Sequence, residues 1–493
     1  MSSGLIFIII ASYFALLILI SFFTGKSNDN DTFFKGNKQS PWYLVAFGMI
    51  GASLSGVTFI SIPGSVGNDM MSYMQIVLGY FIGYLIIAFV LLPLYYRLNL
   101  TSIYGYLQQR FGNYSYRTGA FYFLISRIAG SSIRLLLVAN VLYEFVFKDW
   151  GVNFEITVII SILLIWVYTF RGGIKTVVWT DTLQTLFMLA AVGLTIAFLA
   201  SELDMNFMQS VSAVSESSFS KMFYFDDWKA GNYFWKHVVG GMFITVCMTG
   251  LDQDMMQKNL TCKNIGEARK NMLWFSAVLV VVNLFFLFLG AMFYVYAEAK
   301  GISFPMAENG KYVADQIYPL LALKMGMSPF IGIVFILGLI AAAYSSADGT
   351  LTALTTTIFV DFMNNDNRTE QQKVRTRKII HILVSIAVLL TVIIFKYTLT
   401  SSAISQVLFV ATLTYGPLLG MFAFGIITKH QVKDVFVPMI CILSPIISYF
   451  VSIYSKDIFF GYQVGYELLA INGGLTYLGM WLVRMGGWFT LLQ

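Results

Sequence analysis

The sequence has few charged residues for its length. Only 11% of the 493 residues are charged, 25 of them acidic and 31 basic, whereas soluble proteins devote about a quarter of their positions to these types. Hydrophobic residues make up 58% of the chain, and the mean hydropathy is +0.74. This composition excludes a water-exposed surface over most of the molecule and predicts an all-α polytopic membrane protein.

Cysteine and histidine are also scarce. Cys247, Cys262 and Cys441 show no CxxC spacing, so we expect neither a disulfide framework nor a thiolate zinc site. The three histidines form no HExxH motif, and the sequence contains no GxxxxGK[ST] nucleotide loop. These absences argue against an enzyme, and we predict no catalytic residue.

Apolar stretches long enough to cross a membrane recur along the whole chain. A spanning helix needs about 20 mostly apolar residues, and this template matches thirteen times. The predicted spans lie near residues 4–24, 43–67, 74–96, 118–147, 153–170, 177–200, 234–257, 271–297, 329–360, 379–395, 401–428, 434–454 and 460–483.

Basic residues are divided unevenly between the two sides that this order of spans defines. One side receives 20 of the 31 Lys and Arg residues and the other receives 9, while Arg127 and Arg134 fall inside a span. Because cytoplasmic loops are enriched in Lys and Arg, the richer side, which includes Lys258 and Arg377, is predicted to be cytoplasmic. We therefore expect a multi-pass protein of the cell membrane with its N-terminus outside and its C-terminus in the cytoplasm. Orientation also explains the net charge of +6, so no nucleic-acid partner is expected.

Two predicted spans contain glycine- and hydroxyl-rich patches that a lipid-facing helix does not need. Residues 48–61 read GMIGASLSGVTFIS in the second span, and residues 240–254 read GGMFITVCMTGLDQD in the seventh. Small polar residues also serve to pack membrane helices together, so one patch alone does not separate packing from binding. Paired interruptions in two halves of a chain are, however, typical of the midplane site of a transporter.

The two patches lie five spans apart, so their helices enter the membrane from opposite sides. We therefore predict two inverted five-helix repeats, residues 43–200 and 234–428. The remaining segments are an extra N-terminal helix with an inner loop at 1–42, an external loop at 201–233, and two C-terminal helices at 429–493.

The ninth span is the most polar. Between Ala341 and Thr357 it reads AAAYSSADGTLTALTTT, which places Ser345, Ser346 and Asp348 in mid-span. The serines have a structural alternative, because a hydroxyl can bond back to the carbonyl one turn earlier. An intramembrane carboxylate more often marks an ion or proton path.

These side chains suit sodium, a hard cation that prefers oxygen ligands. An unwound helix also frees main-chain carbonyls for binding. The carbonyls of Gly51 and Leu54 in the first patch and the hydroxyls of Ser345 and Ser346 would together form a sodium cage.

Several longer motifs appear along nearly the whole chain. They are FFKGNKQSPWYLVAFGMIGASLSGVTFISIP (33–63), TSIYGYLQQRFG (101–112), RGGIKTVVWTDTLQT (171–185), DQDMMQKNLTCKNIGEARK (252–270) and AAAYSSADGTLTALTTTIFVDF (341–362). Together they resemble the sodium/solute symporter family, which includes bacterial sodium-coupled galactose, sialic acid and proline carriers. The resemblance implies a leucine-transporter-like fold of five plus five helices that works by alternating access, with sodium as the coupling ion.

The resemblance also implies a ligand set for sodium. By position, the main sodium site of the family would use the carbonyls of Gly51, Leu54 and Ala342 and the hydroxyls of Ser345 and Ser346. This set agrees with the cage derived from the chemistry of the two patches.

Two carboxylates extend the implied ion site. Asp181 matches the aspartate of the family's GG-x-x-x-V-x-W-T-D motif, which in relatives lies near the ion-release path or a second sodium; alternatively it is a helix-entry carboxylate beside Lys175. Relatives that bind a second sodium continue the serine pair with further serines, whereas this chain has Ala347, Asp348 and Gly349. Asp348 would then supply the charge for a second cation or carry a proton.

For the solute, the first patch resembles the sialic acid branch of the family. That similarity implies Ser55 and Thr58 as pocket residues, while Thr245 stands where the sugar carriers have an asparagine. Tyr73 and Gln75 on the third span and Met248 on the seventh are further candidates for lining or gating the pocket, although such side chains mostly serve packing.

Two arginines inside the fourth span are candidates for holding a solute carboxylate. In the sialic acid branch an arginine does so at a position equivalent to Gly130, and Arg127 and Arg134 lie three residues before and four after it, on the same helix face. The planar guanidinium suits a carboxylate. Alternatively, either arginine pairs with Glu144, Asp181 or a helix end.

The sequence thus predicts a secondary active symporter. It would import a small polar solute with sodium, most simply a sugar or a sugar acid such as sialic acid, and would work as a monomer in the lipid bilayer. The alternatives are a sodium symporter for an amino acid or another carboxylate and, from a different class, a sodium-conducting channel.

Overall fold

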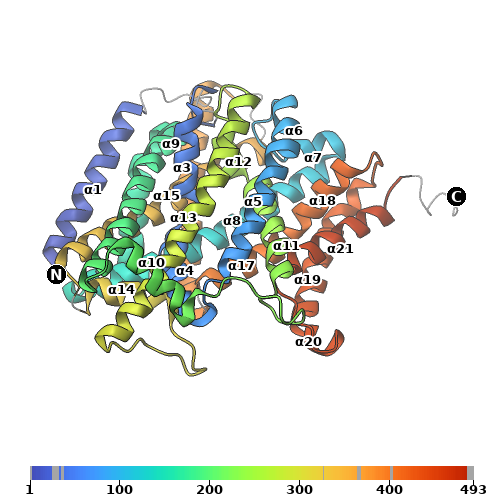
Figure 1. The fold of residues 1–493 in the computed structure, drawn as a ribbon. Helices are drawn as coiled ribbons and strands as arrows, with labels where there is room; N and C mark the ends of the chain where they lie inside the picture. The colour runs from blue at the N-terminus through green and yellow to red at the C-terminus, as the bar shows by residue number, and fades with distance from the viewer. Residues whose placement is uncertain are drawn as a thin grey trace.

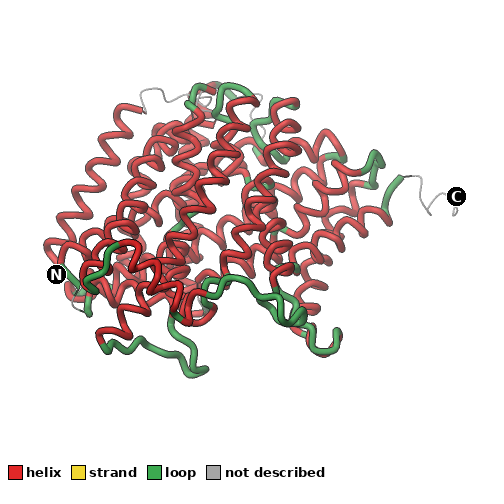
Figure 2. Tube along the Cα trace, viewed as in Figure 1, coloured by secondary structure: helices red, strands yellow, loops and turns green. Residues whose placement is uncertain are grey.

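The computed structural model describes residues 3–24, 33–34, 38–325, 327–363, 368–399 and 403–485. Within these ranges the regular secondary structure is helical, and only isolated β-bridges interrupt it (Figure 2). The expected all-α class is therefore confirmed. Most of the long helices lie roughly alongside one another (Figure 1).

The helices begin and end as follows. The α-helices are α1 (Ser3–Thr24), α3 (Trp42–Ser53), α4 (Gly56–Asp69), α5 (Tyr73–Ile86), α6 (Leu92–Arg97), α7 (Gly105–Arg110), α8 (Asn113–Leu142), α9 (Phe154–Glu202), α10 (Phe207–Glu216), α11 (Phe234–Thr245), α12 (Gln253–Asn259), α13 (Ile265–Lys300), α14 (Ala314–Leu323), α15 (Pro329–Thr357), α16 (Glu370–Thr398), α17 (Ala403–Thr414), α18 (Gly416–Ile427), α19 (Val437–Ile453), α20 (Ser455–Ile458) and α21 (Leu468–Leu482). Short π-helical turns include η2 (Ile87–Leu91), η6 (Val246–Gly250) and η7 (Ile358–Phe362).

Many of these helices are long and apolar enough to cross a membrane. Among the described residues there are seven such helices, or up to ten if each of three bent pairs is one span. Shorter apolar helices lie at Phe7–Phe23, Phe154–Val167 and Leu468–Leu482. The expected spans at 153–170 and 177–200 correspond to two helical stretches within α9, which meet at a kink at Gly173, where φ is 50°. The total of thirteen spans stays a prediction.

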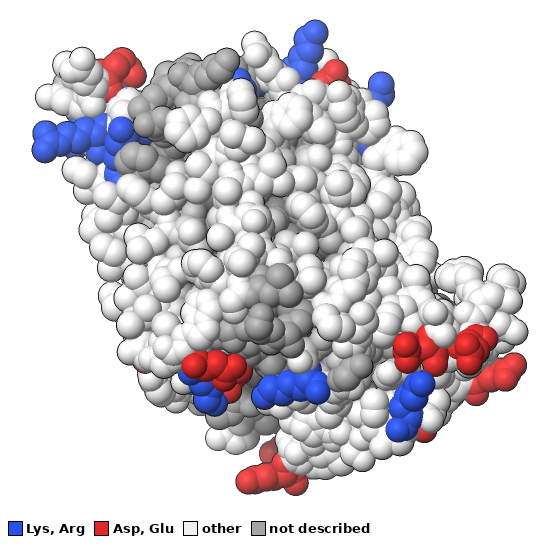
Figure 3. All heavy atoms as spheres, turned by 90° about the vertical axis from the view of Figure 1, so that its left-hand side faces the viewer, with Lys and Arg blue, Asp and Glu red and all other residues white. Residues whose placement is uncertain are grey.

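Charged side chains gather at two opposite ends of the molecule on the face shown in Figure 3. Between these ends the visible described atoms belong to uncharged residues. Large apolar side chains are exposed on the surface of the described structure, as with Phe22 at 66% and Leu390 at 53% exposure. Helices α10 and α14 lie at the same end as the start of α1 (Figure 1).

Helices α5 and α11 approach each other so closely that glycine is required on both sides. A Cβ at Gly79 would lie 2.1 Å from the Val238 carbonyl oxygen, and a Cβ at Gly241 would lie 2.2 Å from that of Ile76. Such contacts allow membrane helices to pack backbone against backbone. The two helices are therefore in direct main-chain contact.

Helix α15 forms the centre of the bundle. Every residue from Ala341 to Thr357 is buried, and α15 packs against α3, α4, α8, α9 and α16. Its polar middle consequently faces protein rather than lipid, as the cost of exposing polar groups to hydrocarbon requires.

Candidate ion and solute site

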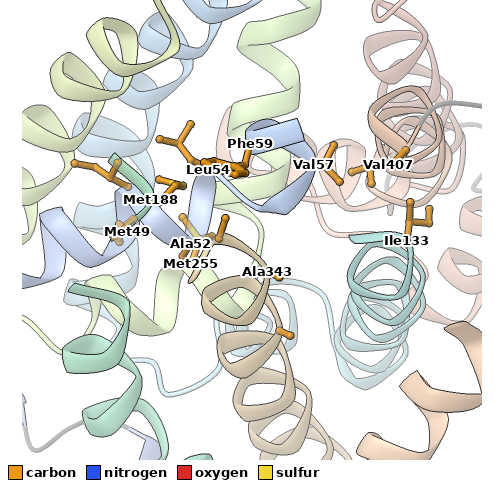
Figure 4. Packing of buried hydrophobic residues seen from close by; sticks show 14 of the residues in the cluster. Met49, Ala52, Leu54, Val57, Phe59, Ile133, Met188, Met255, Ala343 and Val407 are labelled. Atoms are coloured by element: carbon orange, nitrogen blue, oxygen red, sulfur yellow. The ribbon is translucent and has the colours of Figure 1, made fainter. Parts of the chain in front are cut away.

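The first polar patch forms a broken helix. Helices α3 and α4 meet at Leu54 and Ser55 with a bend of 56°. A break interrupts the ladder of backbone hydrogen bonds and leaves carbonyl groups at its edges. Met49, Ala52 and Leu54 lie here among apolar side chains such as Met188 of α9 (Figure 4), while the amides of Asn259 and Asn271 approach the Met49 sulfur at 3.3 Å.

Helices α9 and α15 meet the broken helix at Gly51. A Cβ on Gly51 would lie 2.2 Å from the Thr185 hydroxyl oxygen and 3.4 Å from that of Ser345. Ser345 Oγ donates a hydrogen bond of 2.6 Å to Asp181 Oδ1. The structure thus brings together Gly51, Ser345 and Asp181, which are far apart in the sequence.

The other expected sodium ligands lie on the same two segments, the broken helix and α15. Leu54 ends the first half of the broken helix, and Ala342 and Ser346 lie on the buried segment of α15. Asp348 is also buried, but it accepts a hydrogen bond from Thr180 Oγ1 of α9 at 3.4 Å and one from the backbone amide of Gly349. The neutral oxygens of these residues, together with the Asp181 carboxylate that is hydrogen-bonded to Ser345, form a donor set that suits a hard monovalent cation.

The second polar patch forms another broken helix, of different chemistry. Helix α11 continues through η6 and meets α12 with a bend of 68°. Asp252 begins α12, and its side chain accepts a hydrogen bond from the Met255 amide at 3.2 Å. Tyr415 also donates a hydrogen bond to Asp252.

Five charged side chains form a series of ion pairs that extends from this second break towards the first. Arg127 Nη2 lies 3.0 Å from Asp252 Oδ1 and 2.6 Å from Asp254 Oδ2. Lys258 Nζ lies 3.6 Å from Asp254 Oδ1 and 2.8 Å from Asp181 Oδ2. We call Arg127, Asp252, Asp254, Lys258 and Asp181 the buried charge chain, since none of them is more than 5% exposed.

The position of Lys258 corrects the sequence interpretation. We expected Lys258 and Arg377 in cytoplasmic loops, but both are helical and each is only 1% exposed. The predicted seventh span ends at residue 257, whereas ion pairing keeps Lys258 buried in the last turn of α12.

A central cavity of about 90 Å³ lies beside the two breaks. Seven of the eight residues expected to contact solute line it: Ser55, Thr58, Tyr73, Arg127, Arg134, Thr245 and Met248. Gln75 does not line it. The Gln75 amide is fully buried, donates to the Asn232 carbonyl and accepts from the Tyr224 amide, so it holds the loop before α11.

The two arginines differ in their partners. Arg127 is held by two carboxylates, whereas Arg134 Nη1 donates to Ser346 Oγ at 3.0 Å. Within the described part of the chain Arg134 makes no ion pair, and its Nε has no hydrogen-bond partner. Arg134 therefore presents unused donors beside the cavity.

A larger vestibule of about 600 Å³ adjoins the central cavity. Tyr73 and Ile404 line both spaces and so lie between them. Tyr73 and Tyr80 are joined through their hydroxyls at 3.0 Å. At the vestibule wall, Asp315 accepts hydrogen bonds from Ser61 Oγ and the Ala403 amide, and burial raises the pKa of Asp315.

Several residues of the site were not singled out from the sequence. Tyr80, Tyr84 and Asn283 line the cavity, but nothing in their local sequence distinguishes them from packing residues. Thr249 also lines it and lies within the polar patch at residues 240–254. The buried charge chain, in contrast, could have been recognised from the sequence. Three charged residues fall within seven positions immediately after a glycine-interrupted apolar span, and Asp254 and Lys258 are four apart, on one helix face.

Comparison with known proteins identifies the family to which this chain belongs. The model of the sodium:solute symporter family matches residues 33–434, which is most of the chain, and the protein belongs to this family. The expected resemblance is thereby confirmed. The family consists of sodium-coupled transporters, and the protein is accordingly a sodium-coupled symporter of the membrane.

Individual relatives are distant but cover the chain well. The sodium/sialic acid symporter SiaT of Proteus mirabilis is 22% identical over 483 residues, covering 95% of this chain and 94% of that protein. The sodium/sialic acid symporter NanT of Aliivibrio fischeri is 24% identical over 435 residues, with 84% and 81% covered. A substrate-bound, outward-open structure of a sodium-coupled sialic acid symporter superposes with a TM-score of 0.80 at 19% identity over 96% of each chain, which shows a shared fold.

Proposed function

We propose that the protein imports a small anionic sugar, of the sialic acid class, together with sodium by alternating access. The solute class is inferred from Arg134. Its guanidinium lies beside the central cavity and forms no ion pair with a carboxylate in the described structure. A half-buried guanidinium that pairs with no carboxylate in the described structure favours an anionic ligand, which would accept two parallel hydrogen bonds. The names of the two bacterial relatives support the same class.

The hydroxyls of the cavity support a polyhydroxylated solute. Ser55, Thr58, Thr245 and Thr249 line the space, with Asn283 as an additional amide. Pockets that recognise polar solutes combine a few such groups with apolar and aromatic walls, here including Tyr73. Gln75 has no part in this proposal, because its amide is engaged elsewhere.

For the ion, the proposed cage consists of the carbonyls of Gly51, Leu54 and Ala342 and the hydroxyls of Ser345 and Ser346. Asp181, which accepts a hydrogen bond from the Ser345 hydroxyl, would add negative charge beside the cage. Ser346 also accepts a hydrogen bond from Arg134, so one residue touches both the ion cage and the solute arginine. Sodium binding would therefore fix the position of Arg134, and by linkage solute would tighten sodium binding by the same factor.

We also propose how the helices are arranged in the membrane. The two broken helices lie in segments 43–200 and 234–428, and we propose these as the inverted five-helix repeats, with 1–42, 201–233 and 429–493 as accessory segments. The N-terminus would lie outside and the C-terminus in the cytoplasm of the cell membrane. A single chain contains both the cage and the cavity, so a monomer would suffice.

The test is uptake into proteoliposomes under an inward sodium gradient, with a panel of sialic acids, neutral sugars, amino acids and monocarboxylates. We expect accumulation of a sialic acid and loss of it in Arg134→Met, with partial recovery in Arg134→Lys. The Ser345→Ala/Ser346→Ala protein should lose the dependence on sodium. Accumulation of a neutral sugar that is insensitive to Arg134→Met would overturn the solute class, and sodium flux without solute would indicate a channel.

A further inference from the structure

The two oxygens of Asp181 face two different partners. Oδ1 accepts the Ser345 hydroxyl at 2.6 Å, and Oδ2 lies 2.8 Å from Lys258 Nζ. Ser345 is a ligand in the proposed sodium cage, so this carboxylate stands between an exchangeable cation site and a cation that is part of the chain. A second sodium at Asp181 would have to displace the Lys258 ammonium.

The surroundings of Lys258 are shaped to keep the ammonium at this position. Lys258 is 1% exposed and is also 3.6 Å from Asp254. On the facing helix, a Cβ at Gly349 would lie 2.9 Å from Lys258 Nζ and 2.5 Å from Asp254 Oδ1. Glycine at position 349 therefore leaves the space that the ion pair occupies.

The carboxylates around the cage are buried together with counterions. Arg127 lies against Asp252 and Asp254, and Lys258 lies against Asp254 and Asp181, with Asp348 within Coulombic range of Lys258. A buried carboxylate needs such compensation, and in the described structure the Lys258 ammonium supplies it at Asp181.

We propose that Lys258 is a tethered counterion that takes the place of a second sodium at Asp181, so that one sodium ion binds in each transport cycle. This inference rests on the proposed function and deepens it. A tethered ammonium has a high effective concentration at its site and need not be captured from solution, so it outcompetes free sodium there. Lys258 acts here as a positioning residue that sets the ion stoichiometry.

The experiment counts bound sodium on the purified full-length protein by equilibrium binding of radioactive sodium, with no solute added. We expect one ion per wild-type chain and two per Lys258→Met chain, because the variant leaves Asp181 without its cation, whereas Asp254 keeps Arg127. The Lys258→Met/Asp181→Asn double variant is the matched control. It removes one charge of each sign and should return to one ion.

The possible outcomes separate this inference from the proposed function. Two ions on the wild type, or one on Lys258→Met, would overturn the role of Lys258 while leaving sodium coupling intact. No bound sodium on the wild type would overturn the proposed cage itself. If Lys258→Met does not fold, the number of sodium ions bound to the Asp181→Asn variant provides the test. One bound ion would support the inference. No bound ion would show that Asp181 is a ligand of the single sodium ion and would overturn it.

Discussion

The two broken helices of the bundle differ in chemistry although they share a geometry. The first, α3–α4, has no charged residue between positions 48 and 61 and offers hydroxyls and carbonyls, whereas the second, α11–α12, carries Asp252, Asp254 and Lys258 in ion pairs. Neutral oxygens bind a monovalent cation loosely enough to release it, but separating buried ion pairs is costly. The difference shows that the first break is suited to binding and releasing a cation, whereas the charges of the second break are suited to holding the surrounding helices in place.

The largest loss of stability is expected when the carboxylates at the second break lose their counterion. Arg127→Met leaves Asp252 and Asp254 without their guanidinium, and breaking a buried pair in this way costs about 3–5 kcal/mol of stability. Arg134→Met is the matched control on the same helix, because Arg134 pairs with no carboxylate in the described structure. Thermal unfolding of both purified variants measures the difference. Equal losses of stability would contradict the contrast between the two arginines.

An intermediate effect is expected at the neutral break. The added Cβ in Gly51→Ala would lie 2.2 Å from the Thr185 hydroxyl oxygen, and overpacking of this kind costs about 1–3 kcal/mol. We expect the stabilisation of the protein by sodium to weaken at least several-fold in apparent affinity, while the ion pairs of the second break persist. Gly193→Ala serves as the control, since a Cβ there meets no atom within 4 Å. An unchanged sodium response in Gly51→Ala would remove Gly51 from the cage.

The smallest effect is expected from a single hydroxyl on the neutral part of the second broken helix. Thr245 lines the cavity, and Thr245→Val removes one hydrogen bond to solute, which is worth about 0.5–1.5 kcal/mol. Solute KM should therefore rise up to about tenfold, with little change in sodium affinity. Thr391→Val is the control, because the Thr391 hydroxyl bonds its own helix at Ala387 away from the cavity. A change in sodium affinity alone would place Thr245 with the ion instead.

The sequence predicted the neutral break better than the charged one, for a physical reason. Glycine, serine and threonine in mid-span have no purpose facing lipid, so Ser55, Thr58 and Ser345 stand out against an apolar background. Lys258 and Arg377 look like loop residues, because hydropathy counts each charge as exposed and cannot register a partner far away in the sequence. Gln75 shows the reverse case: a polar residue near the expected pocket whose amide is used to anchor a loop.

The glycine contact between α5 and α11 limits how the transporter can move. With Gly79 against Val238 and Gly241 against Ile76 at main-chain distance, a sliding step along this interface would drive carbonyl oxygens into the opposing backbone. The two helices should therefore travel as one rigid unit, although they belong to different halves of the chain. Opening and closing must then be absorbed by bending elsewhere, and the helix breaks at Leu54–Ser55 and after Gly250 are where we expect the motion to concentrate.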